Sequence, residues 1–216
     1  MQEYRPKPEL TIRDEASLRA LFPATHELAI KKCQATLDKH ARDYIARSPF
    51  LCLGTQNADG KADVSPRGDP AGFVKVVDRE TLVIPDRPGN NRLDSLVNIV
   101  SNPSVGLLFL IPGFDDTLRV NGTASLVVDP DLLETLSING RAPTIAILVK
   151  VTSVFMHCAK AFRRSHLWDP DRFLDRSEMP SLMNIILDQT EGAPQDDTQM
   201  NELDQKLEEE YRNTLY

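Results

Sequence analysis

The spacing of hydrophobic residues changes twice between Thr81 and Leu110. Thr81–Ile84 is a short apolar run that contains β-branched residues, as in a mostly buried strand. Four apolar residues then recur at i, i+3, i+4 and i+7, which is one face of a short helix: Leu93, Leu96, Val97 and Val100. The apolar run from Val105 to Ile111 is again typical of a strand. The pattern predicts strand, loop, helix and strand.

The loop in this stretch has the composition of an anion site. Turn-forming residues follow Pro85, and Asn90 or Asn91 is placed to cap the helix. The N-terminus of a helix carries unpaired backbone N–H groups and the positive end of the helix dipole. Arg92 adds a charge there, and Arg87 is a second candidate. A phosphate would fit this site; the alternative is a capped surface helix with an exposed arginine.

Strand-like runs also occur on both sides of this stretch. They are Phe50–Thr55, Ala62–Arg67, Phe73–Val77, Thr117–Val128 (with a bend or bulge expected at Gly122) and Ala146–Met156. Six or seven strands joined mainly by short turns predict an antiparallel barrel or sandwich. The alternation of strands and helices that defines a Rossmann fold is absent, as is its glycine motif.

Helical patterns flank the predicted sheet. A proline-rich arm is followed by a short helix capped by Asp14, and a longer helix is predicted from Thr25 to Ser48. After the sheet come a basic amphipathic stretch and an acidic helix with Met200, Leu203, Leu207 and Tyr211 on one face. That last helix is marginal alone, so we expect it to dock on this chain or on a partner. We expect one structural domain in three segments: residues 1–48, 49–170 and 171–216.

Composition narrows the function. The net charge of −7 argues against nucleic acid or an anionic membrane as the partner. No apolar run approaches a membrane span and no signal-peptide core is present, so we expect a cytoplasmic protein. The three cysteines, Cys33, Cys52 and Cys158, are interpreted as buried small hydrophobic residues. No ligand spacing among the histidines indicates a metal.

A second candidate anion contact lies in the sequence ADVSPRG. Pro66 cannot donate to a strand ladder, so its strand should lie at an edge or break there. Arg67 and Arg92 are then predicted to converge on one phosphate through charge-assisted hydrogen bonds. The alternative is that Arg67 pairs with Asp63 or Asp69 on the surface, where such pairs contribute little.

Four runs together resemble the pyridoxamine 5′-phosphate oxidase superfamily, over roughly residues 40–170. They are ADVSPRGDPAGFVKV, LVIPDRPGNNRLDSLVNIVSNPSVGLLFLIPG, LRVNGTA and HCAKAFRRSHLW. Within that superfamily the chain is similar to the bacterial FMN-binding proteins called pyridoxamine-phosphate-oxidase-related. SPRGDPAGF and IPDRPGNNRLDS are the most specific parts of the resemblance.

The resemblance implies a six-stranded antiparallel split barrel that forms a homodimer, with FMN in each of two clefts between the subunits. It implies that the flavin and its phosphate lie along Val64, Ser65, Pro66 and Arg67. Ile84 and Pro85 would border the ring, and Asn91 and Arg92 would hold the phosphate, with asparagine in place of one basic residue. Thr117 would reach the flavin from the partner subunit.

The C-terminal part departs from the oxidases proper, which carry arginine, histidine and tryptophan residues there to grip the substrate. In this chain Lys160 and Trp168, with neighbouring arginines, would close over the flavin or bind an anionic substrate. The alternative is a basic helix that covers the barrel mouth, with Trp168 as an anchor.

We therefore expect an FMN-dependent oxidoreductase acting on a small molecule, with NAD(P)H as a candidate electron donor. The flavin would carry the redox chemistry and the protein would bind and orient it. Two alternatives remain: a non-catalytic flavin or haem carrier or sensor on the same barrel, and a deazaflavin-dependent reductase.

Overall fold

The computed structural model describes residues 4–216, which form two compact units divided between Cys33 and Gln34. The first unit contains a 3-10 turn, η1 (Pro8–Leu10), and two short helices, α1 (Glu15–Arg19) and α2 (Glu27–Lys31). Asp14 caps α1 as predicted, because its carboxylate accepts a hydrogen bond from the Ser17 N–H at 2.8 Å. These three elements bury no residue. The first three residues of the predicted arm lie outside the described residues.

The prediction of one continuous helix from Thr25 to Ser48 is wrong. The chain forms α2 and then a separate helix, α3 (Lys39–Arg47), which begins after Asp38. Between them, Gln34 exchanges backbone hydrogen bonds of 2.8–2.9 Å with Val154. The Leu37 N–H donates to the carbonyl of Arg79 at 2.7 Å. Backbone groups that pair with distant strands are not available for a helical ladder, so the helix is interrupted.

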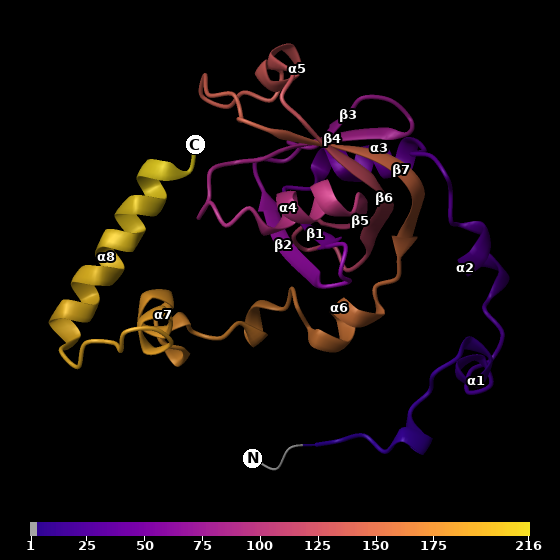
Figure 1. Ribbon diagram of the computed structural model, residues 1–216, viewed down its shortest axis with the longest axis horizontal. Helices are drawn as coiled ribbons and strands as arrows, with labels where there is room; N and C mark the ends of the chain where they lie inside the picture. Colours follow the sequence, from indigo (N-terminus) through magenta and orange to yellow (C-terminus); the bar gives the residue numbers. More distant parts are fainter. Residues whose placement is uncertain (1–3) are drawn as a thin grey trace. The chain divides into compact units, whose positions relative to one another are not determined.

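Seven antiparallel strands form a single sheet in the second unit (Figure 1). They are β1 (Phe50–Gln56), β2 (Ala62–Gly68), β3 (Lys75–Val76), β4 (Thr81–Pro85), β5 (Ser104–Leu110), β6 (Thr117–Val127) and β7 (Ala146–His157). Their order across the sheet is β2-β1-β5-β6-β7-β4-β3. The family resemblance implied six strands, and the structure has seven. The shortest strand is the two-residue β3, which pairs only with β4. β2 lies at the other edge of the sheet and pairs only with β1. Pro66, which has no N–H to donate, is tolerated there because β2 has no second neighbouring strand.

One hydrophobic cluster joins the sheet to helices α3 and α4. Phe109, Leu107 and Leu53 are among its fully buried side chains. Helix α3 packs against β6 and β7, and α4 (Asp94–Ser101) packs against β1 and β6. A smaller cluster joins Val83 of β4 to Leu133 of α5 (Pro130–Glu134). Because α4 is fixed to the sheet through this core, its N-terminal end has a defined position next to β2.

Strand β6 carries the irregularity predicted at Gly122. The register between β6 and β7 shifts between Asn121 and Gly122. A Cβ atom at Gly122 would overlap the carbonyl oxygen of Lys150. Only glycine allows this close approach of the two backbones, so the residue fixes the bulge.

The chain after β7 forms short elements and then one long helix. They are α6 (Lys160–Ser165), the 3-10 turns η2 (Pro170–Arg172) and η3 (Arg176–Glu178), α7 (Leu182–Asp188) and α8 (Asp197–Thr214). The acidic helix predicted from the sequence is α8; it packs on α7, which the sequence pattern did not reveal. No helix within residues 4–216 has the length and hydropathy needed to cross a membrane.

None of the three cysteines is fully buried, contrary to the prediction. Cys33 and Cys158 are exposed, and Cys52 is half-buried in β1. Cys33 lies in the first unit, whose helices bury nothing, and Cys158 follows the last residue of β7. A hydrophobic sequence context therefore did not ensure burial at either position.

Candidate functional site

A cleft of about 820 Å³ lies beside the edge strand β2. Its lining consists of Phe73 and three segments of the second unit: residues 63–68, 85–96 and 142–145. The first segment is β2, the second is the loop from β4 into α4, and the third leads into β7. The cleft thus forms where the sequence predicted a phosphate site, at the N-terminal end of α4.

The alternation of β2 separates its side chains into two sets. Asp63, Ser65 and Arg67 are half-buried, whereas Val64 and Pro66 are exposed. All five residues line the cleft. Since side chains alternate along a strand, the three polar groups share one face of β2, the face directed at α4.

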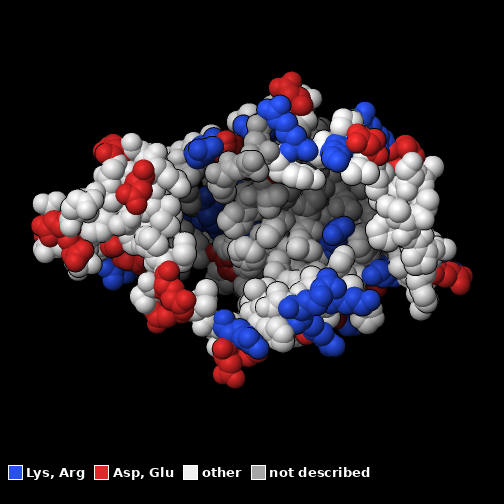
Figure 2. Space-filling model, turned by 90° about the horizontal axis from the view of Figure 1, so that it is seen from below, with Lys and Arg blue, Asp and Glu red and all other residues white. Residues whose placement is uncertain are grey.

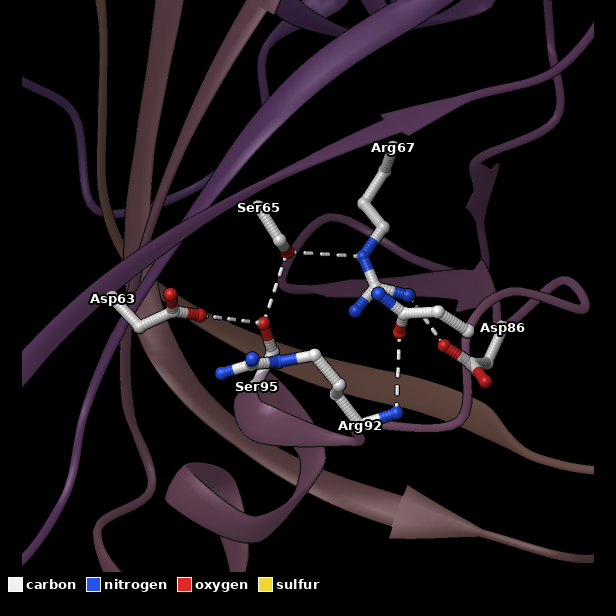
Figure 3. A network of polar contacts seen from close by, with 7 residues as sticks. Asp63, Ser65, Arg67, Asp86, Arg92 and Ser95 are labelled. Carbon is white, nitrogen blue, oxygen red and sulfur yellow. Dashed lines mark hydrogen bonds and ion pairs between the residues drawn. The ribbon is translucent and has the colours of Figure 1, made fainter. Parts of the chain in front are cut away.

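A chain of polar contacts joins β2 to α4 (Figure 3). Arg67 donates from Nε to Ser65 Oγ at 3.2 Å, and Ser65 Oγ lies 2.9 Å from the hydroxyl of Ser95. The Ser95 hydroxyl is also 3.1 Å from the carboxylate of Asp63. Ser95 is only 3% exposed and lies on the inward face of α4. Sequence reasoning missed Ser95, although a polar residue at a core-facing helix position signals a buried partner.

Arg67 pairs with Asp86, not with the surface partners considered as the alternative. The guanidinium Nη1 donates to Asp86 Oδ1, and the two side chains are 18% and 21% exposed. Of the two aspartates expected as partners, Asp63 contacts Ser95 and Asp69 pairs with Arg87. An ion pair shielded to this degree is held more firmly than a typical surface pair.

Arg92 has a different environment from Arg67. Its side chain is 72% exposed and pairs with Asp94 at 2.8 Å. The hydrogen bond from Arg92 to Asp94 raises the pKa of the guanidinium. Both arginines line the cleft, one fixed by its neighbours and one at the solvent-facing rim.

The N-cap prediction for α4 is wrong. The N-cap is Leu93, which has a left-handed backbone (φ 59°) and no side-chain bond to the helix. Asn90 instead accepts a hydrogen bond from the Arg92 N–H at 3.1 Å, and Asn91 is left-handed with φ 56°. The asparagines therefore shape the loop before the helix, and the first helical N–H groups receive no N-cap side chain.

Arg87 is a third arginine in the cleft lining. Its Nε donates to Asp69 at 2.7 Å and its Nη2 to the carbonyl of Leu136 at 2.9 Å. The side chains of Arg87 and Asp69 are 15% and 2% exposed. Three arginines thus line the cleft together with three aspartates, Asp63, Asp86 and Asp94, so its formal charge is balanced.

The charge on the face of the molecule in Figure 2 is also mixed. Lysine and arginine side chains are interspersed there with aspartate and glutamate side chains. This face carries no broad field of one sign of the kind that attracts a polyanion.

The structure brings together seven of the eleven predicted site residues. Those that line the cleft are Val64, Ser65, Pro66, Arg67, Pro85, Asn91 and Arg92. Four do not line it. Ile84 is fully buried in β4, and Thr117 is buried at the start of β6, opposite His157. Lys160 is the first residue of α6, and Trp168 follows that helix.

Trp168 anchors the segment after α6 to the loop between β5 and β6. Its indole Nε1 donates to the carbonyl of Phe114 at 2.8 Å, and its ring lies 5.9 Å from that of Phe162. Phe114 also borders a second hollow, of about 410 Å³, together with Tyr44. The Tyr44 hydroxyl donates to the Asp116 carbonyl at 2.7 Å, and burial raises the pKa of Tyr44 to about 12.

Fold and site together define a mainly-β protein with an arginine-lined cleft at a helix N-terminus. Residues 37–158 match the family model described as pyridoxamine 5′-phosphate oxidase. The match covers more than half of the chain, so the chain belongs to the pyridoxamine 5′-phosphate oxidase-like family. Its sheet with flanking helices is the split barrel of that family, as the sequence resemblance implied. No curated protein matches the sequence.

Several solved structures are similar to this chain at low identity. An FMN-binding protein from Syntrophomonas wolfei subsp. wolfei is 12% identical, with 66% of this chain and 96% of that one covered and a TM-score of 0.43. An F420 reductase is 21% identical (52% and 94% covered, TM-score 0.41). HutZ, the haem storage protein of Vibrio cholerae, is 14% identical (55% and 93% covered, TM-score 0.40). These values are too low to support a statement about cofactor or activity.

Proposed function

We propose that this chain is an FMN-binding flavoprotein, an oxidoreductase that acts on a small molecule, with the FMN phosphate held in the cleft beside β2. The observation that carries the proposal is the convergence of three arginines on one cleft at the N-terminal end of α4. Arginine forks and unpaired helix N–H groups are a suitable donor set for a phosphate dianion. The volume of about 820 Å³ also lies in the usual range for cofactor sites.

The residues present fit FMN in a specific way. Val64 and Pro66 offer an exposed apolar surface along β2 for a flat ring, and Pro85 borders the same cleft. Arg67 and Arg92 would hold the phosphate, with Asn91 beside them. Bound flavin would supply the hydride and electron transfer, and the protein would bind and orient it. The proposal includes a small-molecule substrate and an electron donor. NAD(P)H is the candidate donor.

We also propose that the protein is a homodimer whose FMN sites use both chains. Exposed valines lie on both elements that flank the cleft: Val64 of β2, which lines it, and Val97 and Val100 of α4, which do not, with exposed fractions of 68%, 60% and 76%. Lys160 and Trp168 lie outside the cleft of their own chain and are not buried, which fits a role in the cleft of a partner. Sedimentation of the flavin-loaded protein tests this proposal. We expect a dimer, and a flavin-loaded monomer would contradict it.

The phosphate assignment is tested by Arg67→Ala and Arg92→Ala. Removing a charge-assisted contact costs ~1.5–3 kcal/mol, which corresponds to roughly 10- to 150-fold in FMN affinity. Arg67 should show the larger loss, because it is the more shielded of the two. Affinity for riboflavin, which has no phosphate, should hardly change in either variant. The measurement is fluorescence titration of the apoprotein with both ligands.

Arg42→Ala is the matched control, because Arg42 lies on α3 outside the cleft lining. If both cleft variants stay within about twofold of the parent protein for FMN, the arginines serve only their ion pairs with Asp86 and Asp94. Equal losses for FMN and riboflavin would assign the arginines to the fold or the ring, not to the phosphate. Because both arginines would share one phosphate, the double variant should depart from the sum of the single losses.

Haem and a deazaflavin are the alternative cofactors that follow from the sequence resemblance. The absorption spectrum of the purified protein separates them: a flavin spectrum supports FMN, a Soret band supports haem, and a deazaflavin has its own spectrum. Oxidation of NAD(P)H by the loaded protein then separates an enzyme from a carrier.

A further inference from the structure

Tyr216, which follows helix α8, contacts the barrel beside the cleft. Its hydroxyl donates to Asp69 Oδ1 at 2.7 Å, across 147 positions of sequence. The guanidinium carbon of Arg87 lies 5.7 Å from the centre of the Tyr216 ring, in a cation–π contact. Arg141, next to the cleft segment 142–145, donates to the main-chain oxygen of Tyr216. Two separate parts of the barrel thus hold this one residue.

Asp69 links Tyr216 to the cleft. Its two carboxylate oxygens have different partners: Oδ1 accepts from the Tyr216 hydroxyl, and Oδ2 accepts from Arg87 Nε. The Asp69 side chain is 2% exposed. A carboxylate buried to this degree is stable only when its charge and its oxygen atoms are satisfied. Loss of the tyrosine hydroxyl would therefore disturb the bond between Asp69 and Arg87.

Arg87 is consequently held from three directions. Asp69 binds its Nε, the Leu136 carbonyl accepts from its Nη2, and Tyr216 covers one face of its plane. Among the described residues, no hydrogen bond uses its Nη1. Since Arg87 lines the cleft, that nitrogen is the part of the guanidinium left for a ligand. A guanidinium fixed in advance loses less conformational entropy when it binds an anion.

We propose that Tyr216 is a positioning residue for the cleft: together with Asp69 it clamps Arg87 as a further anion contact, so the segment after α8 tunes phosphate affinity. This proposal rests on the proposed function in taking the FMN phosphate as the anion. It assigns Tyr216 no direct contact with the ligand. Its effect passes entirely through Arg87, and that makes it measurable as an energetic coupling.

The decisive experiment is a double-mutant cycle for FMN affinity. Arg87→Gln should weaken FMN binding about tenfold or more, as expected for loss of a contact to a charged group. Tyr216→Phe keeps the ring but removes the bond to Asp69, so its loss should be smaller, about threefold. In the Arg87→Gln background Tyr216→Phe should have no further effect. Riboflavin affinity should stay unchanged throughout.

Tyr211→Phe is the matched control, since Tyr211 lies on α8 itself and is 45% exposed. It should leave FMN affinity unchanged. If Tyr216→Phe weakens FMN binding equally with and without Arg87, the two residues act independently and the proposal is wrong. The same conclusion follows if riboflavin affinity falls with FMN affinity.

A second measurement tests the clamp without any flavin. The hydrogen bond to Asp69 raises the pKa of Tyr216, and the charge of Arg87 opposes that shift. Asp69→Asn should therefore lower the pKa of Tyr216, and Arg87→Gln should raise it. Ultraviolet titration, with Tyr216→Phe subtracted, isolates this phenol. An unchanged titration in Asp69→Asn overturns the clamp itself. If the parent protein binds no FMN, the phosphate role falls together with the proposed function, whatever the titration shows.

Discussion

The sheet-bearing part of the second unit and the chain after His157 are held together by different means. Between residues 34 and 157, a continuous cluster of buried side chains connects α3 and α4 with β1, β4, β5, β6 and β7. After His157, Met200 is the one buried residue among those that the structure describes. That segment is tied to the sheet by single polar contacts, such as Arg163 with Asp115 at 3.1 Å and the Trp168 indole with Phe114.

This difference separates two kinds of positioning. Residues that line the cleft from α4 take their geometry from a close-packed core, which resists small displacements. The edge strand β2 buries no residue and is held by its hydrogen-bonded ladder with β1 and by its polar contacts with α4. Tyr216 lies beside the cleft, at the end of a helix whose main neighbour is α7 (Figure 1). A few hydrogen bonds set its position, so a ligand or a partner chain can change it at low cost. The cleft therefore combines a rigid wall with an adjustable contact.

The largest effect should come from opening the core. Phe109 is fully buried in β5, and Phe109→Ala should cost ~3–5 kcal/mol of unfolding free energy through lost burial and a residual cavity. Leu203→Ala, at a half-buried position of α8, is the comparison variant and should cost far less. Denaturant unfolding measures both. Similar losses for the two variants would show that the two regions are not held differently.

Removal of residues 192–216 should have a smaller effect. It deletes α8 and Tyr216, and with them Met200 and the contacts to Asp69 and Arg87. Each kcal/mol of lost stability lowers the melting temperature of a chain of this size by about 2–4 °C, so a measurable decrease should appear in calorimetry. An unchanged melting temperature would count against docking of α8 on this chain or on a dimer partner.

The smallest effect should be a response to alkaline pH. Because the hydrogen bond to Asp69 raises the pKa of Tyr216, this bond stabilises the folded state fully below the ordinary tyrosine pKa of 10.0. The contribution is lost as the pH rises through the higher pKa of the folded state. Amide hydrogen exchange at the end of α8, corrected for the intrinsic rate, should then increase. Tyr216→Phe should remove this dependence, and an identical pH response in that variant would refute it.

The sheet was predictable because each of its longer strands has a recognisable hydrophobic pattern in the local sequence. Alternating or continuous apolar runs fixed the positions of the longer strands, and Gly122 marked the bulge in β6. The longer helix predicted from Thr25 failed for a different reason. Its interruption is caused by backbone bonds from Gln34 and Leu37 to partners far along the chain. A local pattern holds no information about such partners.

The candidate site shows the same limit. The turn chemistry before α4 and the position of Arg67 located the cleft, but not the pairing within it. Proximity in sequence favoured Asp63 or Asp69 as the partner of Arg67, whereas the fold supplies Asp86. Asp69 is instead shared by Arg87 and Tyr216. These pairings join segments that are far apart in the sequence, so they follow from the three-dimensional arrangement alone.

The balance of three arginines and three aspartates in the cleft has a consequence for how an anion would enter. Each cleft arginine already has a carboxylate partner, so the positive charges of the cleft are neutralised by aspartates of the protein itself. An incoming phosphate must share or displace an internal carboxylate before it gains the full attraction of a guanidinium. Long-range attraction to the site is therefore weak, and selection depends on the shape and spacing of the anion's oxygen atoms. Because the competing charges belong to the protein, added salt should alter capture less than it would at a cleft lined by unpaired arginines.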